Sequence, residues 1–482
     1  MATQTPATST RTWGYFIGGE FRTSGEPFVI RSPYDQSEVG VTCWTPEAEI
    51  EEAIEGGRTA FRAVAELPTF ERAEMLLRMS AGVQARKEEL VRLLALEAGK
   101  PVKAARVEVE RCIFNLRNAA EEAQRLGHEF LDLDLLASTR RRYGLVRRVP
   151  LGPILGITPF NFPLNLVAHK VAPALAAGNT VVQKPSPKTP LCSLALAEVA
   201  RDSGVPAGAL NVINCPNERV ERLVADERFK MLTFTGSALV GWRLKAAAGK
   251  KRVALELGGN AGCIVHHDAD LGQAAQRCVA GGFSYAGQSC ISVQRILVHR
   301  SVHERFLSDL VERAGGLRLG DPLEEKTDVG PLISEGAARR VEGWIQEAVA
   351  GGARVRCGAR REGSIVHPTV LTETRPEMKV NCEEIFGPVV TVEPYDDLEK
   401  ALEAVNDSPA GLQAGIFSRD LRTIARAFER LEVGGVIAND APTFRVDHMP
   451  YGGVKASGSG REGARYAIEE MTERKILVLN LE

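Results

Sequence analysis

The amino-acid sequence predicts an α/β protein with two domains, each built on a mostly parallel sheet with helices on both faces. The prediction depends on two stretches, after Gly152 and after Gly259, in which short β-rich runs alternate with helical runs. Strand–helix–strand crossovers leave this pattern in a sequence. The length of 482 residues agrees with it, because about 150 residues per domain gives roughly three structural units or two large ones.

The N-terminal quarter has a different pattern. Residues 13–41 contain short alternating apolar runs broken by Gly, Pro and Asp, which predict strands and turns. Between Pro46 and Gln124 the apolar residues recur every three or four positions, which predicts helices. The first residues, MATQTPATSTRTWGYF, lack the apolar centre of a signal peptide, and we expect them to form a short disordered lead.

The central stretch supplies the elements of the first domain. Strands are predicted in LGPILGITPF, NTVVQKPS, MLTFTGS and KRVALELGG, and helices in LNLVAHKVAPALAAG and ALVGWRLKAAAG. The second alternating stretch contains QRILVHR, SVHERFLSDLVERAGG, ARRVEGWIQEAVAGGA, PVVTVEPYD and LEKALEAVND. Two further strand patterns, RRYGLVRRVPLG and RKILVLNL, have no partner close in the sequence. We expect these two strands to form a small sheet, which two subunits could share.

The composition argues against several classes of protein. Hydrophobic residues make up 44% and charged residues 25% of the chain, which is typical of soluble globular proteins. The formal net charge of −2 gives no general attraction to nucleic acid or anionic lipid, and no apolar run is long enough to predict a membrane span. The nine cysteines are odd in number and form no CxxC pair. The sequence therefore predicts neither a disulfide framework nor a zinc or other metal site, and it favours a reducing cytoplasm.

The stretch GGFSYAGQSCISVQR surrounds Cys290 with small and polar residues. A catalytic cysteine must be reachable, must become a thiolate, and must face a place where an oxyanion is stabilised. Small neighbours permit the approach of a substrate and leave backbone N–H groups accessible. By itself, however, a lone cysteine is more often a small apolar residue of the core.

Two further polar residues stand at the ends of apolar segments. Glu256 ends the strand in ALELGGN, where it is either a general base at the mouth of a cleft or a cap for backbone N–H groups. Asn161 lies between two aromatic residues in ITPFNFPLN. Its amide is either a buried structural group or an oxyanion donor.

Two turns have the features of an anion site. In LTFTGSALVG a strand runs into Gly236 and Ser237 and then into a helix, whose N–H groups and dipole suit a phosphate. The segment lacks the GxGxxG fingerprint, so an ordinary turn capped by Ser237 is the alternative. Lys184 follows a strand in VVQKPSPKTP, where it would donate to a ribose or a phosphate, or else be a solvated loop lysine.

Seven segments occur together in the order and approximate spacing of the aldehyde dehydrogenase superfamily. They are Asn161-Phe162-Pro163, Lys184-Pro185-Ser186, Phe234-Thr235-Gly236-Ser237, Glu256-Leu257-Gly258-Gly259, Gly287-Gln288-Ser289-Cys290, Glu384-Ile385-Phe386-Gly387-Pro388 and Pro450-Tyr451-Gly452-Gly453. The chain resembles this superfamily from FIGGEF to RKILVLNL. Within the superfamily, the sequence around these motifs is most similar to one branch. That branch includes the lactaldehyde, succinate-semialdehyde, non-phosphorylating glyceraldehyde-3-phosphate and phosphonoacetaldehyde dehydrogenases.

The resemblance implies three structural parts. A Rossmann-type dinucleotide-binding domain would comprise residues 1–126 and 148–256, and an α/β catalytic domain residues 257–462. A small β-arm used for oligomerisation would comprise residues 127–147 and 463–482. The protein would be a cytoplasmic homodimer or homotetramer that acts on a small-molecule aldehyde, with no nucleic-acid or membrane partner.

The resemblance also implies the reaction and its residues. The aldehyde would be oxidised to the carboxylic acid with NAD or NADP, through a cysteine thiohemiacetal and a thioester. Cys290 matches the nucleophile, Asn161 the oxyanion donor, and Glu256 the base that activates water. The matched cofactor-binding residues are Phe160, Lys184, Ser186, Gly236, Ser237, Gly241, Glu384 and Phe386.

Departures from the superfamily pattern bear on specificity. Pro187 stands where members that prefer NAD often carry a glutamate, so we expect NADP to be accepted alongside NAD. Arg111 and Arg445 are candidates to bind the anionic tail of a small hydroxy- or carboxy-aldehyde, although Arg111 could instead pair with a neighbouring glutamate on a helix surface. Ser289 replaces the arginine of phosphate-specific members, which argues against a phosphorylated substrate.

Three competing functions fit the sequence less well. In a CoA-acylating relative, CoA rather than water would take the acyl group, but such enzymes commonly lack the glutamate matched by Glu256. A non-catalytic scaffold protein is disfavoured because Cys290, Asn161 and Glu256 are all intact. A cysteine hydrolase without redox chemistry would not need the cofactor motifs.

Overall fold

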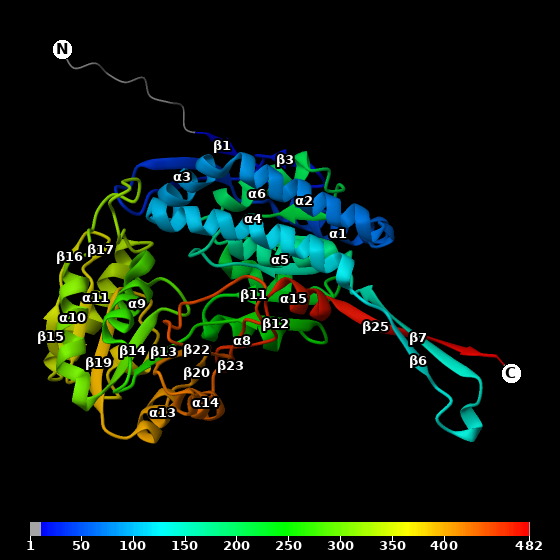
Figure 1. The fold of residues 1–482 in the computed structure, drawn as a ribbon. Helices are drawn as coiled ribbons and strands as arrows, with labels where there is room; N and C mark the ends of the chain where they lie inside the picture. Colours follow the sequence, from blue (N-terminus) through cyan, green and yellow to red (C-terminus); the bar gives the residue numbers. More distant parts are fainter. Residues whose placement is uncertain (1–10, 482) are drawn as a thin grey trace, which may run out of the picture.

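The computed structural model describes residues 11–481, which form two α/β lobes and a projecting β-arm (Figure 1). Most of the predicted N-terminal lead, residues 1–10, lies outside the described residues. The rest of that lead is not disordered as predicted, because it forms β1 (Thr12–Trp13) and the start of β2 (Tyr15–Ile17). Its aromatic side chains Trp13, Tyr15 and Phe16 are buried, which holds these strands in place.

The first lobe contains an eight-stranded sheet in the order β24-β12-β11-β8-β9-β10-β2-β3. Its five central strands are parallel: β8 (Ile154–Ile157), β9 (Val181–Lys184), β10 (Leu210–Val212), β11 (Met231–Thr235) and β12 (Arg252–Glu256). Antiparallel strands extend both edges: β2, β3 (Glu20–Arg22) and β24 (Gly458–Ser459). The predicted parallel sheet is therefore confirmed.

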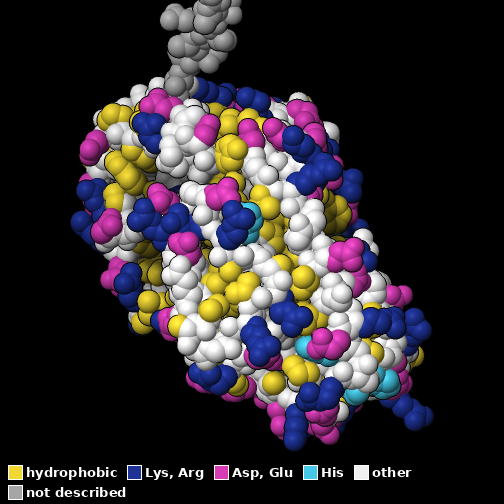
Figure 2. Space-filling view, turned by 90° about the vertical axis from the view of Figure 1, so that its left-hand side faces the viewer, with side chains coloured by type: hydrophobic (Ala, Val, Ile, Leu, Met, Phe, Trp, Pro, Cys, Tyr) yellow, Lys and Arg dark blue, Asp and Glu magenta, His cyan; other side chains and the backbone are white. Residues whose placement is uncertain are grey.

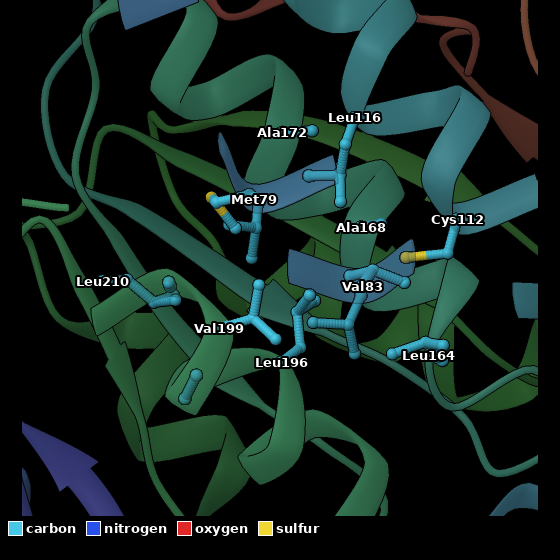
Figure 3. Packing of buried hydrophobic residues seen from close by; sticks show 14 of the residues in the cluster. Met79, Val83, Cys112, Leu116, Leu164, Ala168, Ala172, Leu196, Val199 and Leu210 are labelled. Carbon is cyan, nitrogen blue, oxygen red and sulfur yellow. The ribbon is translucent and has the colours of Figure 1, made fainter. Parts of the chain in front are cut away.

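Helices cover both faces of this sheet, as alternation along its strands requires. Ile154 and Val181 pack into one apolar cluster, whereas the next residues, Leu155 and Val182, pack into another. The helices of this lobe are α1 (Glu47–Glu66), α2 (Thr69–Ala85), α3 (Lys87–Ala98), α4 (Val102–Arg125), α5 (Asn165–Ala177), α6 (Leu191–Asp202), α7 (Val220–Ala225), α8 (Ala238–Ala247) and α15 (Ala464–Glu470). Figure 3 shows the cluster in which side chains of α2, α4, α5 and α6 meet.

The second lobe contains a seven-stranded sheet in the order β15-β18-β19-β14-β13-β21-β22. Only β15 (Arg354–Cys357) is antiparallel. The parallel strands are β13 (Ala261–Val265), β14 (Val293–His299), β18 (Thr369–Thr372), β19 (Val389–Tyr395), β21 (Gln413–Phe417) and β22 (Gly435–Ala438). The helices are α9 (Leu271–Phe283), α10 (His303–Gly315), α11 (Glu335–Ala350), α12 (Lys379–Cys382), α13 (Leu398–Asn406) and α14 (Leu421–Arg430).

Smaller sheets complete the two lobes. A three-stranded sheet joins β1, β4 (Pro27–Arg31) and β5 (Glu38–Cys43). Two pairs of short strands are β16 (Arg361–Glu362) with β17 (Ile365–Val366), and β20 (Ala410–Gly411) with β23 (Val454–Lys455).

The arm confirms that the two strands without near partners pair with each other. In it, β25 (Thr472–Asn480) runs antiparallel to β7 (Arg142–Pro150), and β6 (Glu129–Asp132) pairs with the other edge of β7. The arm stands clear of both lobes (Figure 1). Four consecutive apolar residues of β25 are each at least 42% exposed: Ile476, Leu477, Val478 and Leu479. The preceding helix α15 packs instead into the core of the first lobe.

One face of the molecule shows no concentration of charge of one sign. On the face in Figure 2, basic and acidic side chains are intermingled, with apolar patches between them. Among residues 11–481, no helix combines the length and apolar character needed to cross a membrane.

Candidate active site

A cavity of about 300 Å³ lies where β8, β11 and β12 end. Ligand sites of α/β proteins commonly form outside the carboxyl ends of parallel strands. Most of the predicted site residues line this cavity: Arg111, Phe160, Asn161, Gly236, Ser237, Glu256, Ser289, Cys290, Glu384, Phe386 and Arg445. Among the described residues, Lys184, Ser186 and Gly241 are predicted site residues that lie outside its lining.

The segment before Cys290 turns sharply and needs small residues. Tyr285, Ala286 and Gly287 all have left-handed backbone angles, with φ of 49°, 53° and 69°. A Cβ atom on Gly287 would lie 2.2 Å from the Gly387 carbonyl oxygen, a distance that no side chain tolerates. The side chain of Gln288 anchors the turn, because its Oε1 accepts a 2.8 Å hydrogen bond from the Ile333 N–H.

The sulfur of Cys290 contacts a hydroxyl and lies near a cation. Cys290 Sγ is 2.9 Å from Tyr451 Oη, and the Arg445 guanidinium lies 3.6 Å from the centroid of the Tyr451 ring. Burial raises the pKa of the Cys290 thiol to about 11, although the Tyr451 hydrogen bond and the Arg445 charge oppose that rise. Both groups stabilise the thiolate relative to the thiol.

The buried amide of Asn161 follows β8 and faces the Cys290 loop. Its Nδ2 donates to the Gln288 carbonyl at 3.0 Å, and its Oδ1 has no hydrogen-bond partner within the described chain. Because an amide nitrogen carries two hydrogens, one N–H remains for a ligand oxygen. The buried Lys100 supports this segment, since its Nζ lies 3.7 Å from the centroid of the Phe162 ring.

Glu256 ends β12 with its side chain buried in the same cavity. Neither carboxyl oxygen has a hydrogen-bond partner in residues 11–481. Burial raises the pKa of Glu256 well above its ordinary range, and the nearby charge of Glu462 adds to the rise, whereas Lys170 and Arg445 oppose it. A carboxylate of raised pKa is a stronger base than an exposed one.

A buried network of ion pairs forms one wall of the cavity. Arg111 donates to both oxygens of Asp447, at 2.6 and 3.0 Å, and Arg445 pairs with Glu462 at 2.6 Å. The alternative that Arg111 pairs with a neighbouring glutamate is therefore wrong. Glu462 also accepts from Lys170 at 2.7 Å.

The sequence analysis did not identify Tyr451, Asp447 and Glu462 as site residues, although each contacts a predicted site residue. Tyr451 stood within the Pro-Tyr-Gly-Gly motif, so that motif was the available signal. Asp447 gave no signal in the sequence, because its partner Arg111 is hundreds of positions away. Glu462 gave none, because its partner Arg445 is predicted to bind the substrate instead.

The start of α8 suits the phosphates of a dinucleotide. Ser237 is the N-cap residue and lines the cavity, and its side chain makes no capping hydrogen bond with the first turn. A Cβ atom on Gly241 would lie 2.4 Å from Leu257 Cδ2. Glycine at this position therefore lets α8 pack closely against the end of β12.

Glu384 and the aromatic rings of Phe160 and Phe386 line the same cavity. Glu384 accepts a 3.1 Å hydrogen bond from the Gly259 N–H, and burial raises its pKa to about 7. The rings of Phe160 and Phe386 meet edge to face at 5.9 Å. A carboxylate beside apolar rings fits a ribose that carries a flat heterocycle, so the residues present fit a nicotinamide dinucleotide.

Lys184, which is predicted to contact the cofactor, contacts another side chain of the protein in this structure. Lys184 Nζ donates to Asn217 Oδ1 at 2.6 Å, and burial lowers the pKa of the amine to about 8. Ser186 Oγ accepts from the Lys188 N–H at 3.2 Å. A cofactor contact of Lys184 or Ser186 stays a prediction.

Comparison with known proteins decides the family. The model of the aldehyde dehydrogenase family matches residues 21–477. The chain belongs to the aldehyde dehydrogenase family. It is accordingly an oxidoreductase, and its family is NAD(P)-dependent. The resemblance of the seven motifs and the predicted fold are both confirmed.

Three relatives of this aldehyde dehydrogenase are especially similar. The 3-sulfolactaldehyde dehydrogenase of Priestia aryabhattai is 42% identical over 99% of this chain and 100% of its own length. Aldehyde dehydrogenase 21 of Physcomitrella patens, solved with the reaction product succinate, is 41% identical, with a TM-score of 0.96 over 98% of this chain and 99% of that one. The glyceraldehyde-3-phosphate dehydrogenase GapN of Methanocaldococcus jannaschii, solved with NADP, is 38% identical, with a TM-score of 0.91 over 95% and 100%.

Substitution of Tyr451 by Phe tests the contact with the sulfur. The hydroxyl stabilises the thiolate, so its loss should raise the pKa of Cys290 and lower the alkylation rate at a given pH by roughly tenfold. Alkylation of Cys290 by iodoacetamide, followed by mass spectrometry across a pH series, measures the shift. The exposed Tyr34→Phe should leave the profile in place. An unshifted profile in Tyr451→Phe would show that the hydroxyl does not act on the sulfur.

Proposed function

We propose that this aldehyde dehydrogenase oxidises a short aldehyde with an anionic group at its far end, using Cys290 as the nucleophile. The supporting observation is the meeting of Cys290, Asn161 and Glu256 in one cavity that two arginines also line. A nucleophile, an amide donor and a base are the groups that oxidation of an aldehyde to an acid requires.

Cys290 begins the reaction by attacking the aldehyde carbon. Its thiolate, stabilised by Tyr451 and Arg445, forms a carbon–sulfur bond and turns the carbonyl oxygen into an oxyanion. The free N–H of Asn161 Nδ2 and the backbone N–H of Cys290 donate to that oxygen. Donors that are fixed in a water-poor cavity stabilise such a charge by several kcal/mol.

Glu256 completes the reaction by hydrolysing the thioester on Cys290. Its carboxylate takes a proton from a water molecule, which then attacks the acyl carbon and releases the acid. NAD(P), when bound, supplies the chemistry of hydride acceptance from the substrate carbon. Ser237 at the start of α8 would hold its pyrophosphate, and Glu384 the ribose next to the nicotinamide.

The anionic tail of the substrate is proposed from the arginines and from the relatives. Arg445 Nε is buried without a partner in the part of the chain that the structure describes, and Arg111 uses only Nε and Nη2 in its pair with Asp447. Each guanidinium has further N–H donors for a carboxylate or a sulfonate. Sulfolactaldehyde and succinate, named for two relatives, carry such groups. Ser289 supports an unphosphorylated substrate, because it supplies no positive charge beside Cys290.

Assembly and location are also part of the proposal. The exposed apolar residues of β25 support a homodimer or homotetramer in which arms pack against a second subunit. All nine cysteines are free thiols, which supports a reducing cytoplasm.

The central prediction concerns Cys290 and Glu256. Cys290→Ala should abolish acid formation while leaving cofactor binding intact. Glu256→Gln should retain a first burst of reduced cofactor but lower steady turnover by about 10²–10⁴-fold, because the thioester is no longer hydrolysed. Absorbance of the reduced nicotinamide and direct analysis of the product measure both effects.

A matched control and the rival functions are tested in the same assay. Cys382→Ala removes an exposed thiol and should keep full activity. Acyl-CoA formed in the presence of CoA would favour the CoA-acylating function, and acid release without cofactor reduction would favour the hydrolase. Turnover retained in Cys290→Ala would contradict the assignment of the nucleophile.

The proposed tail site predicts a selective effect of Arg111→Met. Loss of a charge-assisted contact should raise KM for succinate semialdehyde by about 10–100-fold and leave KM for propionaldehyde within about threefold. The matched control is Arg117→Met, on the exposed face of the same helix. Equal effects on the charged and the neutral aldehyde would contradict a tail site and indicate a structural role for Arg111.

We also propose that NADP is used alongside NAD. Pro187 provides no carboxylate to repel a 2′-phosphate, and the exposed Lys188 follows it. Lys188 Nζ lies 5.7 Å from the centroid of Phe160, which lines the cavity. An amine at this position attracts the extra phosphate of NADP.

Kinetics with both cofactors test this specificity. The unmodified enzyme should use NADP with a kcat/KM comparable to that for NAD, and Pro187→Glu should lower the NADP value about tenfold or more by like-charge repulsion. The NAD value should change little. An NADP efficiency hundreds-fold below that for NAD in the unmodified enzyme would refute the proposal.

A further inference from the structure

We propose that His266, His267 and Asp268 bind Zn²⁺ on the second lobe, away from the catalytic cavity, with His299 as a fourth ligand. The three consecutive residues follow directly after the end of β13 at Val265. One ligand atom from each lies within 4.8 Å of the other two. None of the four residues lines the cavity that contains Cys290, so this site is separate from the proposed aldehyde site.

The hydrogen bonds of His299 and His266 decide which ring nitrogen is open to a metal. His299 Nδ1 accepts from the Ser301 N–H at 3.3 Å and contacts Ser301 Oγ at 2.8 Å, so the neutral ring carries its proton on Nε2 and must lose that proton or shift it before Nε2 binds the ion. His266 Nδ1 contacts Tyr395 Oη at 2.7 Å, which leaves its Nε2 for the ion. Metal-binding histidines almost always have such a partner on the nitrogen that does not bind the metal, since it fixes the tautomer and the ring orientation.

The rings of the three histidines form a compact group. The centroid of the His299 ring lies 5.5 Å from that of His266 and 5.2 Å from that of His267.

Asp268 provides a carboxyl oxygen that lacks a partner. Its Oδ2 accepts from Ser418 Oγ at 3.0 Å and from the Arg419 N–H at 2.9 Å, which holds the side chain at the end of the strand. Its Oδ1 is buried, with no hydrogen-bond partner among the described residues. An unsatisfied buried oxygen is costly, and a cation at this position would satisfy it.

The donor set favours zinc over the hard divalent cations. Two or three imidazole nitrogens and one carboxylate suit Zn²⁺, whereas Mg²⁺ and Ca²⁺ prefer oxygen ligands. Zinc bonds of about 2.0–2.2 Å place tetrahedral ligand atoms roughly 3.4 Å apart. The exposed side chain of His267 is free to rotate and close the remaining gap. The prediction of no metal site was based on the number and spacing of the cysteines, which give no information about a cluster of histidines.

Zinc titration of the full-length enzyme tests the proposal. With a chromophoric chelator as competitor, the unmodified protein should bind Zn²⁺ at a site that His267→Gln weakens by about tenfold or more. His299→Gln should weaken it by a smaller factor. His367→Gln is the control, because His367 is a partly exposed histidine whose side chain is paired only with Glu362 within the described chain.

Two further readouts separate this site from the thiols and from catalysis. X-ray absorption of the zinc-loaded protein should show nitrogen and oxygen ligands without sulfur. His267 is exposed, so His267→Gln should fold and oxidise aldehydes as the unmodified enzyme does. Equal zinc affinity in His267→Gln, His367→Gln and the unmodified protein would overturn the proposal, as would a sulfur-dominated spectrum.

Discussion

The placement of a half-buried Cys290 and a buried Glu256 in one cavity is the constraint on which the rest of the site depends. Both side chains must carry negative charge to act as proposed, yet removal from water disfavours the charged form and raises the pKa of each. The cavity therefore needs groups that favour negative charge without admitting water. Tyr451, Asn161 and Arg445 are such groups, and each comes from a segment far from Cys290 in the sequence.

The arginines that favour negative charge in the cavity need acidic partners of their own. An unpaired arginine in the interior would be costly, and Arg445 and Arg111 are accordingly paired with Glu462 and Asp447. The Arg111–Asp447 pair connects α4, and the Lys170–Glu462 pair connects α5, with the glycine-rich segment near the C-terminus. The same contacts thus hold the first lobe to that segment and set the electrostatic conditions around the sulfur.

Much of the fold was predictable because strand and helix patterns are local. The alternation after Gly152 and Gly259 predicted both parallel sheets, and the strands that end at Lys184 and Glu256 were placed correctly. The prediction of a disordered N-terminal lead was wrong beyond residue 10, because Trp13 and its aromatic neighbours are buried by residues far along the chain. A local composition rich in Ser and Thr carries no information about such contacts.

The sequence by itself determined the family and the small size of the residues around Cys290, and it predicted which residues react. Motif order and residue type carry that information, and the left-handed turn at Gly287 explains it physically. Only the tertiary structure decided that Tyr451 meets the sulfur, that Arg111 pairs with Asp447, and that three histidines gather beyond β13. The histidines gather because β13 and β14 are parallel neighbours whose ends lie side by side. Tyr451 and Asp447 instead reach Cys290 and Arg111 from the segment near the C-terminus, at 161 and 336 positions along the chain, which no local pattern in the sequence reveals.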